Sequence, residues 1–242
     1  MKLLIDIGNT RTKWRGFQAN IRVDEGLFDN SELAEDVLND FFMARGVRSI
    51  VLSNVGKTEI ARMFYLVGER VGVQCQCIQS AREMAGLRFV YEEVTSLGVD
   101  RCLAMIGAYD NKGVLVIDAG SAITADYLAG DGRHLGGYIL PGCRMLMLSL
   151  KAGTSKVLVD AEIASSEPGK STQMCVNNGF TLMLQSLLTG LQTKAGELGI
   201  SEVVITGGDA DLIAHACPDI EFDQKNNLVL DGMEKLLNSE EL

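Results

Sequence analysis

The 242-residue chain is poor in proline and tryptophan and has no long apolar run. It holds three prolines and one tryptophan, and no segment is of low complexity, so disorder is not expected. No apolar stretch reaches the roughly 18 residues that a membrane span needs. Only three apolar residues separate Lys2 from Asp6, too few for the apolar core of a signal peptide. We therefore expect a folded cytoplasmic protein without a membrane partner.

Histidine is also scarce, and the cysteines show no metal-site spacing. The two histidines, His134 and His215, do not lie near a matching cysteine pattern. Cys75 and Cys77 form the one close cysteine pair, but a metal site would require a second ligand pair at a suitable spacing. The six cysteines are most simply reduced thiols in a protein core.

Basic residues are outnumbered, 22 against 32 acidic ones, which gives a net charge of −10. A general nucleic-acid binder needs a basic face, so no nucleic-acid partner is expected. A small anionic ligand remains compatible with this balance, because backbone N–H groups and a few cationic side chains can hold a phosphate locally.

The most informative feature is a motif that occurs twice. The segment LLIDIGNTRTKW places Asp6 and Gly8 directly after an apolar run, and LVIDAGSAITAD repeats this layout with Asp118 and Gly120. Thr12 would then match Thr124. One such segment would indicate only a tight hairpin, whereas two in one chain indicate a duplication.

The hydrophobic pattern predicts alternating strands and helices, which is typical of an α/β fold. We expect each half to begin with a hairpin and the two repeated turns to face one another across a cleft. Strands are predicted at 2–7, 13–17, 47–55 and 73–79 in the first half, with helices at 31–45, 57–72 and 100–109. In the second half the pattern predicts a hairpin from 113, helices at 143–151, 172–197 and after 207, and a closing strand and helix from 226.

Each repeated turn has the chemistry of a phosphate site. Glycine at a hairpin tip leaves backbone N–H groups open to a ligand, and Asn9, Thr10 and Thr12 add side-chain donors. Lys13 adds a positive charge. A carboxylate such as Asp6 beside phosphates requires a cation between them, and nucleotide-bound Mg²⁺ commonly uses one or two carboxylates.

Two further segments are compatible with a phosphoryl-transfer site. Asp100 and Arg101 follow Gly98 at the start of a predicted helix, where a carboxylate could serve an acceptor hydroxyl and the arginine an anionic group. Taken alone, the pair is better explained as a helix cap, Asp100, and a surface residue, Arg101. The segment TGGDA, from Thr206, could let a flat ring or a phosphate approach the backbone, or could be a plain strand-to-helix connection.

Five motifs in this order resemble those of type III pantothenate kinases: DIGNT, LGVDR, DAGSAIT, GGYILPG and TGGDA. The resemblance implies a duplicated actin-like (ribonuclease H-like) two-lobe fold, with lobes 1–112 and 113–242 and ATP in the cleft between them. It also implies ATP-dependent phosphorylation of pantothenate, the first step of coenzyme A biosynthesis. A homodimer, Mg²⁺ with ATP, and a monovalent cation, K⁺ or NH₄⁺, are implied as well.

The resemblance assigns a role to each motif residue. Asp100 would be the catalytic base, Asp6 would help to hold Mg²⁺, and Asp118 would bind the monovalent cation. The ATP-binding residues would be Asp6, Ile7, Gly8, Asn9, Thr10, Arg11, Thr12, Lys13 and Ser121. Pantothenate would be bound by Tyr91, Gly98, Val99, Asp100, Arg101 and Thr172, with Arg101 at its carboxylate and Thr154 as a weaker candidate.

Two positions depart from the family pattern. Ser121 stands where the family has threonine, which keeps the hydroxyl, and Phe89 stands where asparagine is frequent. Two alternatives stay open from the sequence: a kinase of the same fold with another small hydroxyl or carboxylate substrate, and a non-catalytic accessory factor for gene regulation.

Overall fold

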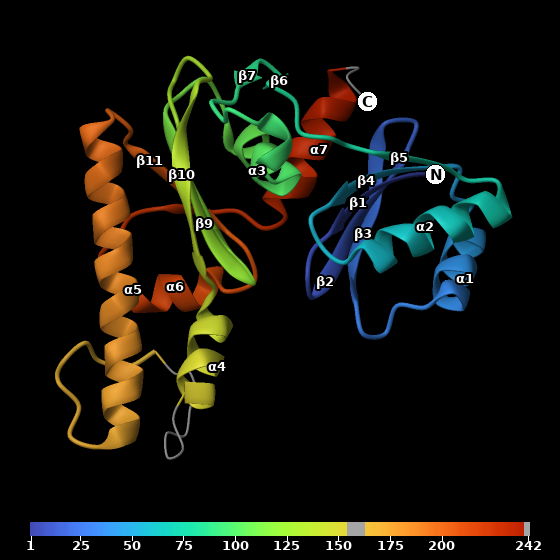
Figure 1. Ribbon diagram of the computed structural model, residues 1–242. Helices are drawn as coiled ribbons and strands as arrows, with labels where there is room; N and C mark the ends of the chain where they lie inside the picture. Colours follow the sequence, from blue (N-terminus) through green and yellow to red (C-terminus); the bar gives the residue numbers. More distant parts are fainter. Residues whose placement is uncertain (154–162, 240–242) are drawn as a thin grey trace. The chain divides into compact units, whose positions relative to one another are not determined.

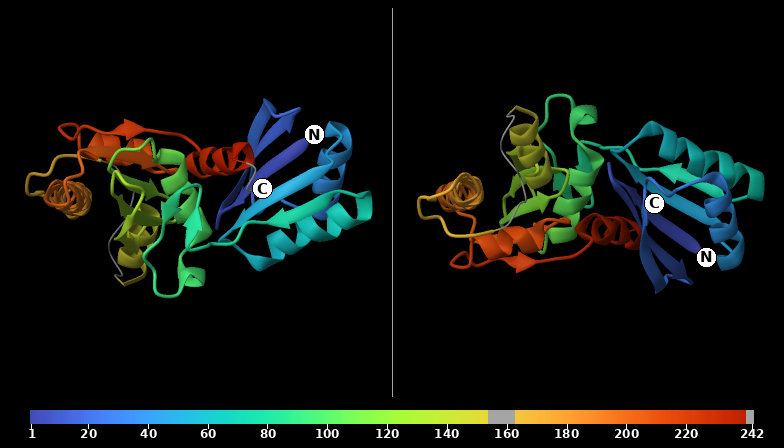
Figure 2. Two further views of the ribbon diagram at one scale, coloured as in Figure 1. Left: turned by 90° about the horizontal axis from the view of Figure 1, so that it is seen from above. Right: turned by 90° about the horizontal axis from the view of Figure 1, so that it is seen from below.

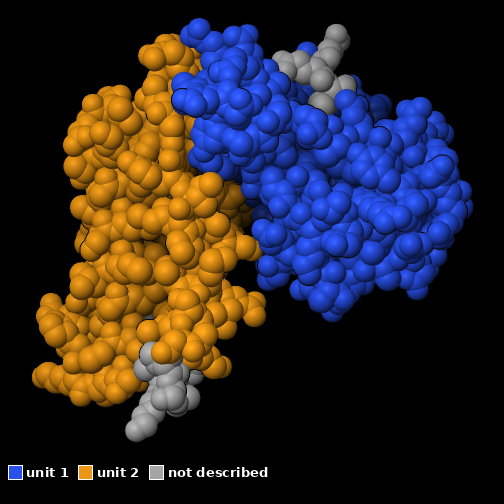
Figure 3. Space-filling view, viewed as in Figure 1, with its two compact units in different colours: residues 1–107, 227–242 blue, residues 108–226 orange. Residues whose placement is uncertain are grey.

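A computed structural model describes residues 1–153 and 163–239, and Figure 1 gives the order of its elements. The chain divides into two compact units, 1–107 with 227–242 and 108–226, which Figure 3 shows in different colours. The predicted lobes, 1–112 and 113–242, differ from these units because the C-terminal segment packs with the first sheet. No helix in the described ranges is long and apolar enough to cross a membrane.

The first unit is built on a five-stranded sheet in the order β3-β2-β1-β4-β5. Its strands are β1 (Lys2–Ile7), β2 (Arg11–Gln18), β3 (Ile21–Asp29), β4 (Ser49–Asn54) and β5 (Gln74–Cys77). Leu3, Ile5 and Ile7 face a core that also holds Phe42 and Phe64 of two helices. These helices, α1 (Glu35–Arg45) and α2 (Thr58–Val71), lie on the same face of the sheet (Figure 2).

The opposite face of this sheet is covered by the C-terminal helix α7 (Leu228–Asn238), which contacts β1 and β2. Both faces of β1 are therefore packed, which explains its unbroken apolar run. The predicted strand just before this helix is wrong, because the chain is helical from Leu228 onward. Three consecutive buried apolar residues, Leu228, Val229 and Leu230, are compatible with either a buried strand or a buried helix, so the sequence pattern alone does not distinguish them.

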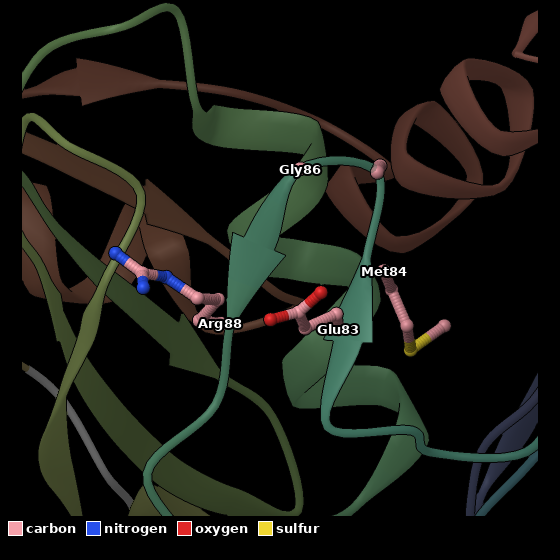
Figure 4. Close-up of a pocket in the computed structure, with 5 residues that line it drawn as sticks. Glu83, Met84, Gly86 and Arg88 are labelled. Atoms are coloured by element: carbon pink, nitrogen blue, oxygen red, sulfur yellow. The ribbon is translucent and has the colours of Figure 1, made fainter.

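The connection between β5 and the next long helix contains a small hairpin and a short 3-10 helix. The hairpin pairs β6 (Glu83–Met84) with β7 (Leu87–Arg88), and the 3-10 helix spans Val94–Ser96. Figure 4 shows Glu83 and Arg88 on neighbouring strands, with Met84 projecting away from them. Helix α3 (Val99–Ala108) follows, and it packs closely against α7: a Cβ on Gly232 would overlap the Leu103 carbonyl.

The second unit repeats the first sheet in the order β10-β9-β8-β11-β12. Its strands are β8 (Val114–Ala119), β9 (Ala122–Leu128), β10 (His134–Pro141), β11 (Glu202–Thr206) and β12 (Asp223–Gln224). Its helices are α4 (Cys143–Gly153), α5 (Thr172–Glu197) and α6 (Ala210–Ala216). In both units two antiparallel pairs are followed by a parallel strand, so the predicted duplication is present in the topology.

The strand register corrects one detail of the predicted repeat. Asp6 pairs with Lys13, and the equivalent Asp118 pairs with Thr124. The residue that matches Thr124 is therefore Lys13 and not Thr12. The sequence match is shifted because the first turn contains one residue more than the second.

Candidate active site

The turn between β1 and β2 is formed around a backbone hydrogen bond from the Gly8 N–H to the Arg11 carbonyl, 3.0 Å long. Asn9, Thr10 and Arg11 are exposed on it. Lys13 is half-buried directly across from Asp6. The arrangement presents polar backbone and a cation beside a carboxylate, as a phosphate–metal site requires.

Asp6 is held from the neighbouring strand β4. Ser53, fully buried and in register with Asp6, donates its hydroxyl to Asp6 Oδ1 at 3.2 Å. The loop after β4 then donates two backbone N–H groups, from Val55 and Gly56, to the Ile7 carbonyl. A Cβ on Gly56 would overlap the Gly8 carbonyl, so only glycine fits against the turn.

Thr12 lies in a different environment from its exposed neighbours. Its side chain is fully buried, and its hydroxyl donates to Asn30 Oδ1 at 2.7 Å. The hydroxyl thus makes a hydrogen bond within the first unit. The sequence predicted a donor toward a ligand here, whereas the structure gives Thr12 a contact that holds the turn.

The second turn shows the same construction around Asp118. Thr206 pairs with Asp118 in register, as Ser53 pairs with Asp6, and Thr206 is buried. The loop after β11 donates the Asp209 N–H to the Ala119 carbonyl at 2.9 Å. Gly207, at φ +101°, leaves no room for a Cβ beside that carbonyl.

Ser121 is exposed at the tip of the second turn, where its carbonyl accepts the Gly142 N–H at 3.2 Å. Cys143, the next residue, is buried. Its burial, and then the neighbouring Asp209 carboxylate, raise the pKa of the thiol to about 11. This cysteine is consequently a neutral thiol at neutral pH, which makes it a poor nucleophile.

All but one of the residues predicted to bind the acceptor lie in the first unit; the exception is Thr172. Arg101 lies in the first turn of α3 beside Asp100, and the residue is 5% exposed. Its Nη1 donates to the Tyr91 hydroxyl at 2.7 Å, and the guanidinium lies 5.5 Å from the Tyr91 ring centroid. Asp100 Oδ1 accepts the Arg101 N–H at 2.8 Å.

The glycine and valine before Asp100 shape the start of this helix. A Cβ on Gly98 would overlap Asp100 Oδ1, so the carboxylate lies over the glycine. Val99 is buried, and Asp100 and Arg101, at the next two positions of the helix, point in different directions from it. The structure therefore brings Tyr91, Gly98, Asp100 and Arg101 into one cluster, as predicted from the sequence.

Thr172 begins α5 and is exposed, and it borders an apolar groove between α4 and α5. Thr154 lies outside the described residues. Phe89 is buried at 2% exposure, which makes it a core residue beneath the Tyr91 segment.

Sequence reasoning missed three residues that hold the first turn: Asn30, Ser53 and Gly56. The signal for two of them was present, since SNVG at the end of β4 occupies the place that TGGD occupies at the end of β11. Asn30 has no counterpart motif and is found only through its contacts.

No group of three or more histidine, cysteine, aspartate or glutamate side chains within the described ranges could hold a metal ion. A metal that arrives with a nucleotide needs fewer protein ligands, because phosphates and water supply the rest. Asp6, a single carboxylate next to the turn between β1 and β2, fits a site for a metal ion that is bound together with a nucleotide.

The duplicated sheets with a carboxylate-bearing turn in each define the class: an actin-like α/β fold of the kind used by acetate and sugar kinases. A structure described as a conserved putative Baf family transcriptional activator from Campylobacter jejuni has this fold, with a TM-score of 0.67 at 21% identity, covering 99% of this chain and 100% of that one. The ethanolamine utilization protein EutJ from Carboxydothermus hydrogenoformans is similar with a TM-score of 0.54 at 11% identity, covering 97% and 88%.

Sequence comparison identifies the family within that class. The model of the type III pantothenate kinase family matches residues 2–194. A type III pantothenate kinase from Pseudomonas fluorescens (strain Pf0-1) is 34% identical over 90% of this chain and 92% of its own. One from Marinobacter nauticus is 33% identical over 99% of each chain. The chain belongs to the type III pantothenate kinase family, as predicted, and is a kinase.

Proposed function

We propose that this kinase transfers the terminal phosphoryl group of ATP to a hydroxyl of pantothenate, the first step of coenzyme A biosynthesis. The observation that carries the proposal is the cluster at the start of α3, where Asp100 adjoins an arginine that Tyr91 holds in place. Family membership favours pantothenate over another small acceptor and over a purely regulatory role.

Asp100 is the base in this proposal. A carboxylate within hydrogen-bond reach of the acceptor hydroxyl orients it and takes its proton as the new O–P bond forms. The backbone N–H of Arg101 donates to Oδ1 of the Asp100 carboxylate, and this hydrogen bond fixes the orientation of the carboxylate. Gly98 leaves the space that the carboxylate occupies.

Arg101 binds the carboxylate of pantothenate in this proposal. A guanidinium offers five N–H donors in a planar fork that matches a carboxylate. The Tyr91 hydroxyl accepts one of these donors at 2.7 Å, and the rotamer of the arginine is thereby held. Val99 is buried, so its contribution to substrate binding comes through packing at the start of α3.

The segment Asp6–Lys13 binds the ATP phosphates in this proposal, with Mg²⁺ on Asp6. Lys13, across from Asp6, supplies a charge toward the phosphates, and Gly8, Asn9, Thr10 and Arg11 present the exposed turn. Mg²⁺, when bound with the nucleotide, neutralises charge on the phosphates. The contributions of Ile7 and Thr12 come from their backbone and their buried side chains.

Asp118 takes the monovalent cation, K⁺ or NH₄⁺, and Ser121 contacts ATP in this proposal. Thr124 lies across from Asp118, where the first turn has Lys13. Thr172, in the second unit, is a further pantothenate-binding residue in this proposal. The protein acts in the cytoplasm.

A homodimer is part of the proposal, and the surface of the second unit supports it. Apolar side chains are exposed on α4 and α5, with a groove of about 690 Å³ between the helices. Large exposed apolar patches on soluble proteins mark contact surfaces. The exposed side chains are Met145, Leu148, Leu150, Met174, Leu182 and Met183. Leu148→Glu should convert the dimer to a monomer in sedimentation.

The acceptor assignment is tested by comparing pantothenate with its alcohol analogue, in which a hydroxymethyl group replaces the carboxylate. The wild-type enzyme should strongly prefer pantothenate in kcat/KM. Arg101→Gln should reduce this preference by about tenfold to a hundredfold, since hydrogen bonds between charged groups contribute about 1.5–3 kcal/mol. An unchanged preference in Arg101→Gln would remove the arginine from the acceptor site.

A further inference from the structure

Asn30, the residue after β3, contacts the turn between β1 and β2 at three points. Its side-chain Nδ2 donates to the Gly8 carbonyl at 2.9 Å, and its backbone N–H donates to the Thr10 carbonyl at 3.0 Å. Its Oδ1 accepts the Thr12 hydroxyl at 2.7 Å. One residue from a neighbouring strand thus fixes the start, the middle and the end of the turn.

These contacts set the direction of two peptide groups. The carbonyl and the N–H of a trans peptide point in opposite directions, and the described residues contain no cis peptide bond. With the Gly8 and Thr10 carbonyls directed at Asn30, the N–H groups of Asn9 and Arg11 are directed away from it. The turn therefore presents these N–H groups on the side opposite Asn30.

We propose that Asn30 is a positioning residue for ATP: it orients the backbone donors of the first turn for the phosphates. The inference rests on the proposed assignment of the segment Asp6–Lys13 to the ATP phosphates. Asn30 would not itself touch the nucleotide. Its effect would pass through the peptides that follow Gly8 and Thr10.

The chemistry of the site requires an amide at position 30. The side chain must donate to a carbonyl and accept from a hydroxyl through two separate atoms, and a short amide carries an NH₂ donor and a C=O acceptor on separate atoms. An aspartate of the same shape would still accept the Thr12 hydroxyl. It would place an ionised oxygen against the Gly8 carbonyl, where no donor remains.

The test compares steady-state kinetics of Asn30→Asp with wild type and with Lys13→Ala. Thr12→Val and Thr12→Ser form a second pair, because only serine keeps the hydroxyl that Asn30 accepts. Ser31→Ala is the matched control, since that hydroxyl donates to Asp29 and not to the turn. KM for ATP, KM for pantothenate, kcat and the melting temperature are measured for each.

Asn30→Asp is expected to raise KM for ATP about tenfold or more, the effect of about 1.4 kcal/mol, with KM for pantothenate within about twofold of wild type. Thr12→Val should raise KM for ATP more than Thr12→Ser does. Ser31→Ala should match wild type in both constants. If the role of Asn30 were merely structural, the substitution would lower the melting temperature and leave KM for ATP and KM for pantothenate unchanged.

Two results would overturn the proposal, and only the second would also overturn the assignment of the turn to ATP. If Lys13→Ala raises KM for ATP while Asn30→Asp does not, the turn binds phosphate without help from Asn30. If neither variant changes KM for ATP, the assignment of the turn to ATP is itself wrong, and the positioning role falls with it.

Discussion

The buried arginine Arg15 on β2 should make a large contribution to the stability of the first unit. Its side chain is 3% exposed, and its Nη1 contacts Asp231 at 2.8 Å and Glu234 at 2.6 Å on α7. Its Nε contacts Glu25 on β3 at 3.3 Å. One guanidinium thus links α7 to two strands of the first sheet.

The cost of removing this guanidinium can be worked from these contacts. A hydrogen bond between charged groups contributes about 1.5–3 kcal/mol. The three carboxylates are 31–37% exposed, so each can regain water when the arginine is lost. Because this rehydration offsets part of the loss, we assign about 1 kcal/mol to each of the three contacts. We therefore expect Arg15→Met to lower the free energy of unfolding by roughly 3 kcal/mol. The melting temperature should fall by about 6–12 °C.

Thermal unfolding and native-state hydrogen exchange would measure the effect. Protection should fall first in α7, because it loses two of the three contacts. Arg22→Met is the matched control: Arg22 is 46% exposed and its ion pair with Glu25 lies at the surface, so the change should stay within about 0.5 kcal/mol. If Arg15→Met cost no more than this control, the stabilising role given to the buried guanidinium would be refuted.

Four further outcomes are expected. Gly190→Ala, inside α5 with open space around it, should raise stability by about 1 kcal/mol in thermal unfolding, and no gain would mean that the site is packed. Ala19→Asn, in the β2–β3 turn at φ +48°, should add roughly 0.5–1 kcal/mol in the same assay, and a loss would contradict that backbone conformation. In the Leu148→Glu variant, which should be monomeric, iodoacetamide at pH 8 should label exposed Cys175 well before Cys143, because a pKa of about 11 leaves little thiolate on the latter; mass spectrometry showing equal rates would contradict this. Gly56→Ala should raise KM for ATP and lower the melting temperature together, and a well-tolerated alanine would show that the loop after β4 does not support the turn.

The sequence was sufficient to predict the elements with strong local patterns. The helices that end at Gly46 and Gly72 are confirmed, with both glycines in the left-handed conformation. The edge strand β3 was missed because its short apolar–polar alternation, Ile21 to Asp24, ends at Glu25 and Gly26, and because none of its residues is fully buried. An edge strand without a buried face gives only a weak hydrophobic period.

The predicted start of α1 was early for a related reason. Asn30 and Ser31 look like helix caps in the sequence, but the helix begins at Glu35 and Ala34 is its cap position. The Asn30 side chain instead donates to the Gly8 carbonyl in the turn between β1 and β2, and the Ser31 hydroxyl donates to Asp29. A side chain that is free to cap in the sequence can be committed to a partner that only the fold brings near.

The candidate site divides in the same way. The residues proposed to touch a ligand lie in compact motifs, so Asp6, Asp100 and Asp118 could be proposed from the sequence. Residues that hold those motifs, such as Asn30 and Ser53, come from other strands and have no spacing signal. The relation between Lys13 and Thr124 also needed the strand register, since one residue of turn length shifts the match.

The most direct test of the central claim is ADP release from MgATP in the presence of pantothenate, measured for wild type and Asp100→Asn with and without K⁺. The substitution keeps the shape of the side chain and removes the base. We predict release that requires pantothenate and K⁺, with kcat about 10²- to 10⁴-fold lower in the variant and an unchanged melting temperature. Wild-type turnover in Asp100→Asn, or no pantothenate-dependent release by wild type under any cation condition, would contradict the account.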